Sequence, residues 1–443
     1  MIELEAYIND VLCGVLTYDP GTQRWAFTYD AEWLARKDAF PLGPTLPLRR
    51  AEDQSAEQQS QAVRIFFENL LPEGRALDDA AATYKVSKSN SIGLLRALGR
   101  ETAGAIELRT PGSQESLEST RRLVSREDLS ERIRERPGVP FTVWDGRVRL
   151  SIAGFQDKLA VFEDAGEWYL VDGSRLASTH LLKPEPVERR LAGLTTNERF
   201  CMQLGDAVGL SVAPTRLEHV PEPVLVVERF DRRREEDRVR RLHCIDGCQA
   251  LGLPAAWKVE RLYGDGRDVR DIRIGASLPA LFAMIDRHAA FPAAVRLALL
   301  RWAVFQVLIG NVDAHAKNLS FFVGPEGLRL APAYDLTCGL IYGDPIEHTL
   351  ALGVGDEFDP QALRAFDWAL FASQCALSPR LVARELTTLA RGCLDRLSTV
   401  HAAVRDEGGD ADTLERVCDA VHDLASRALK TAPLVPEAFA NLD

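Results

Sequence analysis

The sequence is poor in three features that would each mark a particular class of protein. Only eight cysteines are spread over 443 residues, a density too low for a disulfide scaffold and typical of a reducing compartment. The longest strongly apolar run, near 302–310, is far shorter than the roughly 18–20 residues that cross a bilayer. The first residues, MIELE, lack the basic start and apolar core of a signal peptide. These absences favour a cytoplasmic protein with no membrane partner.

The chain also lacks an excess of positive charge. Lys and Arg number 53 against 65 Asp and Glu, which gives a formal net charge of −12. A protein that coats nucleic acid by bulk charge is therefore excluded, although a local basic patch is not. Hydrophobic residues make up 46% of the chain, so a folded protein with large cores is expected rather than a disordered one.

Apolar patterns divide the chain into parts of different character. Residues 1–109 mix alternating strands with helices, and residues 110–120 are rich in turn formers and predict a linker. Strand patterns dominate 121–230, whereas 231–443 becomes helical. We therefore expect an α+β protein with an N-terminal α/β subdomain, a β-rich lobe and an α-rich lobe. The expected strands are 4–8, 13–18, 25–29, 104–108, 148–152, 158–162, 168–171, 180–182 and 224–228, and the expected helices are 62–71, 196–208, 278–289, 292–310 and most of 360–430.

A polar segment at 310–322, GNVDAHAKNLSFF, separates an apolar helix from an apolar strand. Asp313 and Asn318 stand in an Asp-x4-Asn spacing. In phosphoryl transfer such an Asp accepts the proton of the attacking hydroxyl, and the Asn holds a metal ion. Asp335 follows a second short apolar stretch and would suit a further Mg²⁺ ligand. Because Asp and Asn are ordinary turn residues, the spacing alone is weak and gains its weight from Asp335.

Two upstream segments could hold nucleotide phosphates. In 151–158, SIAGFQDK, the small residues Ala153 and Gly154 would let backbone N–H groups approach a phosphate. The segment is not a GxGxxG loop, so an ordinary hairpin turn stays an open alternative. Lys183 ends an apolar strand. A lysine that binds phosphate would stand at such a position, and so would any ordinary lysine at the edge of a sheet. Glu198 could pair with Lys183 as the strand lysine and helix glutamate of protein kinases do.

The expected strand at 224–228 is followed directly by charged residues. This pattern suits either a hinge that offers backbone groups to an adenine or a simple strand end. The dense charge run 229–238 is expected to be a solvated loop. The Cys-x3-Cys pair at 244–248 has no second pair nearby, so a zinc site is not expected.

These segments, in this order, resemble the HipA family of bacterial toxin kinases. The similarity extends to the N-terminal part, through EWL at 32–34, NLLP at 69–72 and GRE with GA at 99–105, and covers most of 1–345. The C-terminal 360–443 matches least. The matching segments are 151–158, 179–183, 228–232, 310–320 with its Asp-x-His-Ala-Lys-Asn core, and 334–335.

The resemblance implies an ATP- and Mg²⁺-dependent serine/threonine protein kinase with a two-lobed, protein-kinase-like fold. In this reading Asp313 is the general base, and Asn318 and Asp335 bind Mg²⁺. The implied ATP contacts are Ala153, Gly154, Phe155, Gln156, Asp157, Lys158 and Lys183 at the phosphates, Glu228, Arg229 and Phe230 at the adenine, and His315, Ala316, Lys317 and Asn318 in the catalytic loop, with Tyr334 and Asp335 beyond it.

Ser151 matches the serine that the family autophosphorylates, in the loop that otherwise closes over ATP. A phosphate there would add about two negative charges beside the nucleotide phosphates. We therefore expect phosphorylation of Ser151 to eject the loop and to inactivate the enzyme.

The resemblance also implies partners. They are a helix-turn-helix antitoxin, operator DNA contacted only through the antitoxin complex, and glutamate–tRNA ligase as the substrate. In 360–443 the arginines alternate with acids, so no basic face for DNA stands out. Two other functions stay open: a small-molecule kinase of the aminoglycoside phosphotransferase type, which can use the same Asp-x4-Asn chemistry, and a non-catalytic co-repressor.

Overall fold

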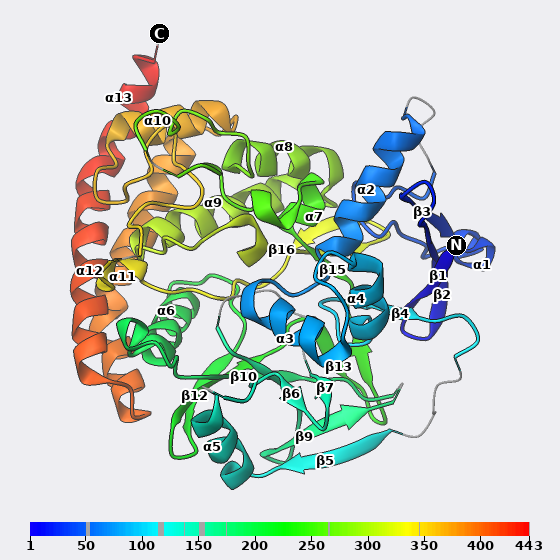
Figure 1. Ribbon diagram of the computed structural model, residues 1–443. Helices are drawn as coiled ribbons and strands as arrows, with labels where there is room; N and C mark the ends of the chain where they lie inside the picture. The colour runs from blue at the N-terminus through cyan, green and yellow to red at the C-terminus, as the bar shows by residue number, and fades with distance from the viewer. Residues whose placement is uncertain are drawn as a thin grey trace. The chain divides into compact units, whose positions relative to one another are not determined.

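The computed structural model describes residues 1–49, 54–113, 119–136, 138–149, 156–173, 175–264, 266–344 and 346–442 (Figure 1). It divides into two compact units, each assembled from three stretches of chain. The first unit comprises Met1–Val187, His219–Ala255 and Phe321–Gly327, and the second comprises Glu188–Glu218, Ala256–Ser320 and Leu328–Asp443. These limits differ from the continuous domains expected from the sequence, because strands and loops distant in the chain pack into the same unit.

The N-terminal part of the first unit is a four-stranded antiparallel sheet with a group of helices. Its strand order is β3-β2-β1-β4. Asn9 and Asp10 both have positive φ, as a two-residue hairpin turn between β1 and β2 requires. The strands are β1 (Ile2–Ile8), β2 (Val11–Asp19), β3 (Arg24–Tyr29) and β4 (Ile106–Arg109), and the helices are α1 (Ala31–Ala35), α2 (Ala56–Glu68), α3 (Gly74–Tyr84) and α4 (Ser91–Leu98).

Helix termini in this part follow local sequence rules. The Asp30 side chain accepts hydrogen bonds from the first backbone N–H groups of α1. Ser55 and Gln58 form a capping box, so α2 begins six residues before the expected helix at 62–71. The helices α3 and α4 were not expected from the sequence.

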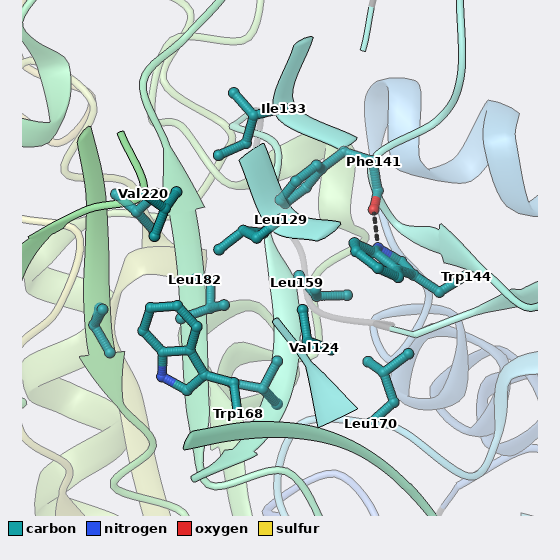
Figure 2. Packing of buried hydrophobic residues seen from close by; sticks show 13 residues of the cluster. Val124, Leu129, Ile133, Phe141, Trp144, Leu159, Trp168, Leu170, Leu182 and Val220 are labelled. Carbon is teal, nitrogen blue, oxygen red and sulfur yellow. Dashed lines mark hydrogen bonds between the residues drawn. The ribbon is translucent and has the colours of Figure 1, made fainter. Parts of the chain in front are cut away.

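The β-rich part of the first unit is an antiparallel sheet that contains the strand series β12-β10-β8-β9-β5. One of its faces carries a buried cluster that includes Trp168 and Leu182 of the sheet, Leu129 of α5, and Trp144, whose indole donates to the Phe141 carbonyl (Figure 2). The elements of this part are β5 (Thr120–Val124), α5 (Arg126–Glu135), β6 (Val143–Trp144), β7 (Arg147–Val148), β8 (Leu159–Asp164), β9 (Glu167–Asp172), β10 (His180–Pro184), β12 (Pro223–Glu228), β13 (Arg232–Arg234), β14 (Val239–Arg241), β15 (Cys244–Asp246), α7 (Gly247–Leu251) and β16 (Ser320–Gly324).

The second unit is mainly helical, as its sequence predicts. The long helix α11 packs against α6, α9 and α12. Within the described ranges, no helix is both long enough and apolar enough to cross a membrane. The helices are α6 (Leu194–Ala207), α8 (Leu278–His288), α9 (Pro292–Leu308), α10 (Ala365–Gln374), α11 (Pro379–Asp406), α12 (Ala411–Thr431) and α13 (Val435–Ala440). The strands β11 (Thr215–His219) and β17 (Gly327–Leu330) each include residues assigned to both units. The mixture of helices and antiparallel sheets confirms the α+β prediction.

Candidate active site

The segment after α9 forms a tight loop that a single asparagine holds in place. The side-chain amide of Asn311 donates to Gln306 Oε1 at 2.8 Å and to the Asp335 carbonyl at 3.3 Å. Its side-chain oxygen accepts the Asp313 N–H at 3.1 Å. Asn311 therefore connects α9, the backbone of Asp313 and the backbone of Asp335. These contacts bring together the backbones of Asp313 and Asp335, the two acidic residues that the sequence predicts to be functional although they lie 22 positions apart.

Gly310, which enters this loop, could not be another residue without strain. Its φ of 63° lies in the left-handed region, and a Cβ atom there would stand 2.7 Å from Leu340 Cδ1. The turn that carries Asp313 away from the end of α9 therefore depends on glycine.

Asp313 has the accessibility that a general base needs. Its side chain is 72% exposed, while the neighbouring His315 side chain is 6% exposed, with Nε2 lying 3.8 Å from Asp313 Oδ1. Burial, reinforced by the positive charge of Lys258, lowers the pKa of His315 to about 3. His315 is therefore neutral at physiological pH, so its contact with Asp313 is not an ion pair.

Asn318 and Asp335 offer oxygen atoms of the kind that Mg²⁺ prefers. The Asn318 amide nitrogen donates to the Asp313 carbonyl at 2.9 Å, so the side-chain oxygen is the atom left for a cation. Asp335 has a φ of 57°, a left-handed conformation that few non-glycine residues adopt. Strained positions of this kind are common at functional sites. The residues present thus fit a magnesium ion.

Tyr334 supports this loop through its hydroxyl group. The hydroxyl donates to the Lys317 carbonyl at 2.8 Å and lies 2.8 Å from Ser320 Oγ. The Ala316 N–H donates to the Lys258 carbonyl at 3.0 Å, which fixes the other side of the loop. Tyr334 therefore acts through the backbone of the catalytic loop in this structure.

In the first unit, two buried lysines lie on neighbouring strands. Lys183 is on β10 and Lys158 directly precedes β8, and both are about 5% exposed or less. Leu182 pairs with Leu159, so the antiparallel register places Lys183 opposite Lys158. Leu182 and Leu159 belong to the buried cluster, and the two lysines lie on the opposite face of the sheet because side chains alternate. Both of these lysines are therefore buried on one face of the sheet, and their contact with nucleotide phosphates stays a prediction.

The other residues of 151–158 that are predicted to contact the ATP phosphates differ in their hydrogen-bond and ion-pair partners. Gln156 Nε2 donates to the Pro184 carbonyl at 3.2 Å, beside Lys183. Asp157 Oδ2 lies 3.6 Å from Arg136 Nη1, so it forms an ion pair within the unit. Ser151, Ala153, Gly154 and Phe155 lie outside the described residues.

Glu228 is the last residue of β12, and Arg229 and Phe230 follow it. Glu228 is exposed and Phe230 packs edge-to-face on Phe322 with ring centroids 5.8 Å apart. The Arg229 side chain instead turns inward, where it donates to Asp231 at 2.8 Å and to Ser178 Oγ at 2.9 Å. Its backbone is also engaged, because the Arg229 N–H donates to the Thr179 carbonyl at 2.9 Å and its carbonyl accepts the Arg232 N–H at 3.2 Å.

The expectation of a solvated loop at 229–238 is wrong for its first part. Arg229, Asp231 and Arg232 are all buried. Asp231 accepts hydrogen bonds from both guanidinium groups and from the Gly104 N–H, and the two arginines lower its pKa despite its burial. These charged side chains can be buried because they pair with one another. The number of charged residues in the sequence does not reveal such pairing.

Sequence reasoning missed two residues of the site. Asn311 lies in the segment 310–322, but the sequence indicated no functional role for it. It indicated none for Gln306 either. The available signal was a polar residue inside the apolar run WAVFQVLIG, because a buried amide needs hydrogen-bond partners. Glu198 is buried on α6 in the second unit and Lys183 lies in the first, so their pairing stays a prediction.

Comparisons with known proteins place this site in a family. A model of the HipA-like C-terminal domain matches residues 150–397, and a model of the HipA N-terminal domain matches 4–109. The chain is 38% identical over 393 residues to the serine/threonine-protein kinase toxin HipA of Shewanella oneidensis, covering 88% of this chain and 87% of that protein. It is 33% identical over 404 residues to the putative kinase Y4mE of Sinorhizobium fredii, covering 89% and 91%.

A solved structure agrees with these sequence matches. The Shewanella oneidensis HipA protein, in a complex with HipB and operator DNA, superposes with a TM-score of 0.84 and 36% identity, covering 98% of this chain and 99% of that one. The expected fold is thereby confirmed. With both family domains matched and the Asp313, Asn318 and Asp335 segments joined by Asn311, the chain belongs to the HipA family and is a serine/threonine protein kinase.

Proposed function

We propose that this kinase transfers the γ-phosphoryl group of ATP to a serine or threonine of a protein substrate. The observation that carries this proposal is the Asn311 network, which holds Asp313 and Asp335 in one loop cluster. Asp313 accepts the proton of the acceptor hydroxyl. The hydroxyl oxygen forms a bond to the γ-phosphorus, and the bond to the bridging oxygen breaks so that ADP leaves.

The other predicted residues bind and orient the nucleotide. Asn318 and Asp335 would hold Mg²⁺, which supplies positive charge at the phosphates. Lys158 and Lys183 would neutralise the remaining phosphate charge, which is supported by their adjacent buried positions. Backbone groups of 228–230 would line the adenine. His315, which is neutral, would help to exclude water beside Asp313.

We further propose that the chain is the toxin of a toxin–antitoxin pair and acts in the cytoplasm. The matched solved structure contains HipA with HipB and operator DNA and covers almost the whole of both chains, which supports an equivalent helix-turn-helix partner here. The net charge of −12 favours contact with operator DNA through that partner rather than directly. Glutamate–tRNA ligase is the proposed substrate, and Ser151 the proposed site of inactivating autophosphorylation.

The decisive experiment compares dephosphorylated wild-type protein with Asp313→Asn after incubation with Mg²⁺ and ATP. Asp419→Asn, an exposed carboxylate on α12, is the matched control. We expect one phosphate on the Ser151 peptide and one on added glutamate–tRNA ligase with wild type and control, and at least a 1,000-fold slower reaction with Asp313→Asn. Peptide mass spectrometry provides the measurement.

Other outcomes would overturn defined parts of the proposal. Full phosphotransfer by Asp313→Asn would exclude the assigned base. A wild-type protein that phosphorylates a small-molecule acceptor, but no protein, would be a small-molecule kinase. A Ser151-phosphorylated form with full activity would exclude the proposed self-inactivation.

A further inference from the structure

The segment around Asp335 is held by side chains rather than by regular secondary structure. Residues 334–338 are all described, and none of them belongs to a helix or a strand; the short 3-10 helix η4 (Gly339–Ile341) begins only after them. Asp335 has a φ of 57°. A non-glycine residue keeps such a conformation only where its surroundings hold it there. The contacts made by the next few residues therefore decide how the Asp335 carboxylate is placed.

Asn197, on α6, supplies several of these contacts from a distant part of the chain. Its side-chain oxygen accepts the Cys338 N–H at 2.8 Å, and its side-chain amide donates to the Cys338 carbonyl at 2.9 Å. The amide also donates to Tyr342 Oη at 3.2 Å. Asn197 thus pairs with both backbone groups of Cys338, as a residue of a neighbouring antiparallel strand would.

This pairing is shielded from water. Asn197 and Cys338 are both 0% exposed. The Cys201 thiol donates to the same Asn197 oxygen at 3.5 Å, so the oxygen and the nitrogen of the amide each have two partners. A buried amide with this many partners is costly to displace, because every lost hydrogen bond leaves a polar group unpaired.

The first turns of α6 are fixed independently of the Asp335 segment. Thr196 Oγ1 accepts the Asp410 N–H at 3.0 Å, and the Arg199 guanidinium donates to both carboxylate oxygens of Glu407, at 2.8 and 2.6 Å. Glu407 and Asp410 lie in the turn between α11 and α12. Asn197 therefore acts from a helix that is itself anchored to the helical part of the second unit.

The catalytic loop holds the same segment from another direction. The Gly339 N–H donates to the Gly310 carbonyl at 2.9 Å, and the Asn311 amide donates to the Asp335 carbonyl at the longer distance of 3.3 Å. The backbone from Asp335 to Gly339 is thus bound to the catalytic loop at both ends. Asn197 adds the contacts that come from α6.

We propose that Asn197 is a positioning residue for the magnesium site. By holding Cys338 and Tyr342, it keeps Asp335 in its left-handed conformation with the carboxylate placed for the metal ion. This inference rests on the proposed role of Asp335 as a Mg²⁺ ligand and adds a residue that supports it. Without Asn197 the segment would lose its contacts with α6, and the backbone at Asp335 would relax toward negative φ. The metal ion would then bind more weakly although every predicted ligand is still present.

The test measures metal binding directly, in the full chain. Mn²⁺, which binds oxygen ligands as Mg²⁺ does and is visible by electron paramagnetic resonance, is titrated in the presence of a non-hydrolysable ATP analogue. Asn197→Leu keeps the branched shape of the side chain and removes its hydrogen bonds. We expect Kd for Mn²⁺ to rise at least about tenfold, the usual cost of losing a group that orients a metal ligand.

Thr196→Val, on the same helix, is the matched control because it removes the hydrogen bond to Asp410 and leaves the Asp335 segment untouched. Thermal unfolding should show a loss of stability in both variants, whereas Kd for Mn²⁺ should stay within twofold of wild type in Thr196→Val. Equal weakening of Mn²⁺ binding in the control would mean that the effect reflects general destabilisation, and would overturn the inference.

Asp335→Asn, titrated alongside, separates the two proposals. Weaker Mn²⁺ binding by Asp335→Asn beside an unchanged Kd in Asn197→Leu would overturn the positioning role alone. An unchanged Kd in Asp335→Asn would remove the proposed metal ligand, and this inference with it. If Asn197→Leu does not fold, Asn197→Ser decides, because its smaller side chain leaves room for a water molecule to pair with the Cys338 backbone. The same loss of affinity there supports the inference, and a wild-type Kd excludes it.

Discussion

Asp335 combines a functional charge with a backbone conformation that constrains its replacement. Asn tolerates the left-handed region better than Ala does. We expect Asp335→Asn to keep the thermal stability of wild type but to lose at least about 100-fold in phosphotransfer, or about 2.7 kcal/mol. Asp335→Ala should lose the same activity and about 1 kcal/mol of stability besides. Thermal unfolding and initial rates measure the two effects, and a fully active Asp335→Asn would contradict the assigned metal ligand.

His243 and His315 are the buried histidines whose titration should be visible in stability. Burial lowers the pKa of His243 to about 4, and its Nε2 bonds to the Leu42 carbonyl at 2.8 Å. Below pH 6.5 the unfolded chain binds a proton at this position that the folded chain does not. Folding therefore loses about 1.4 kcal/mol per pH unit for each such histidine as the pH falls from 6.5 toward 4.

Replacing His243 with Gln keeps a donor for Leu42 and removes this titration. The free energy of unfolding of His243→Gln, measured by urea titration between pH 7 and 5, should fall less steeply with decreasing pH than that of wild type. The difference between the two slopes should correspond to about one bound proton. Equal slopes for the two proteins would show that His243 titrates normally.

At the scale of elements, the catalytic loop depends on the Asn311 side chain more than on any regular structure. Asn311→Ala would leave the buried Gln306 amide oxygen and the Asp313 N–H without their partners. We expect a loss of about 2–3 kcal/mol in stability and a fall in kcat larger than any rise in KM for ATP. Asn441→Ala, an exposed residue directly after α13, is the control and should change neither quantity. A normal kcat in Asn311→Ala would mean that the loop keeps its geometry without this residue.

The buried charge cluster after β12 should behave differently from the exposed charges next to it. Asp231→Asn removes the anion that faces Arg229 and Arg232, and should destabilise the protein by about 3–5 kcal/mol because a buried charge loses its partner. Asp237→Asn, in an exposed ion pair with Arg175, should cost under about 1 kcal/mol. Chemical denaturation of both variants tests the contrast. Similar small costs would show that Asp231 is dispensable for the cluster.

At the scale of the whole molecule, the first unit is assembled from segments far apart in the sequence. His243 contacts the Leu42 carbonyl, Gln249 donates to the Phe66 carbonyl, and Asn69 donates to the Leu253 carbonyl. We therefore expect an isolated 1–109 fragment to lack cooperative unfolding, because its buried polar groups would lose partners. Circular dichroism during heating provides the measurement, with the full chain as reference. A sharp transition in the fragment would show that these residues fold on their own.

Part of this fold was predictable because its signals are local. The alternation of strands such as β1 and β3 follows from one face being buried, and the strands β1–β3 and β8–β10 stand where the sequence predicts them. The helices α3, α4 and α5 escaped prediction. In α5 only Leu129 and Ile133 are buried apolar residues, so its period is weak and it forms by packing against the sheet.

The sequence by itself determined the chemistry that is available: Asp313, Asn318 and Asp335 in a kinase-like spacing, lysines near strand ends, and a family resemblance that the comparisons confirm. Only the tertiary structure decided which of these groups meet and which turn away. Asn311 joins two acidic segments, Lys158 and Lys183 each lie next to the paired residues Leu159 and Leu182, and Arg229 pairs inward with Asp231. Hydrogen bonds and ion pairs between distant residues depend on how the chain packs, so no local pattern in the sequence records them.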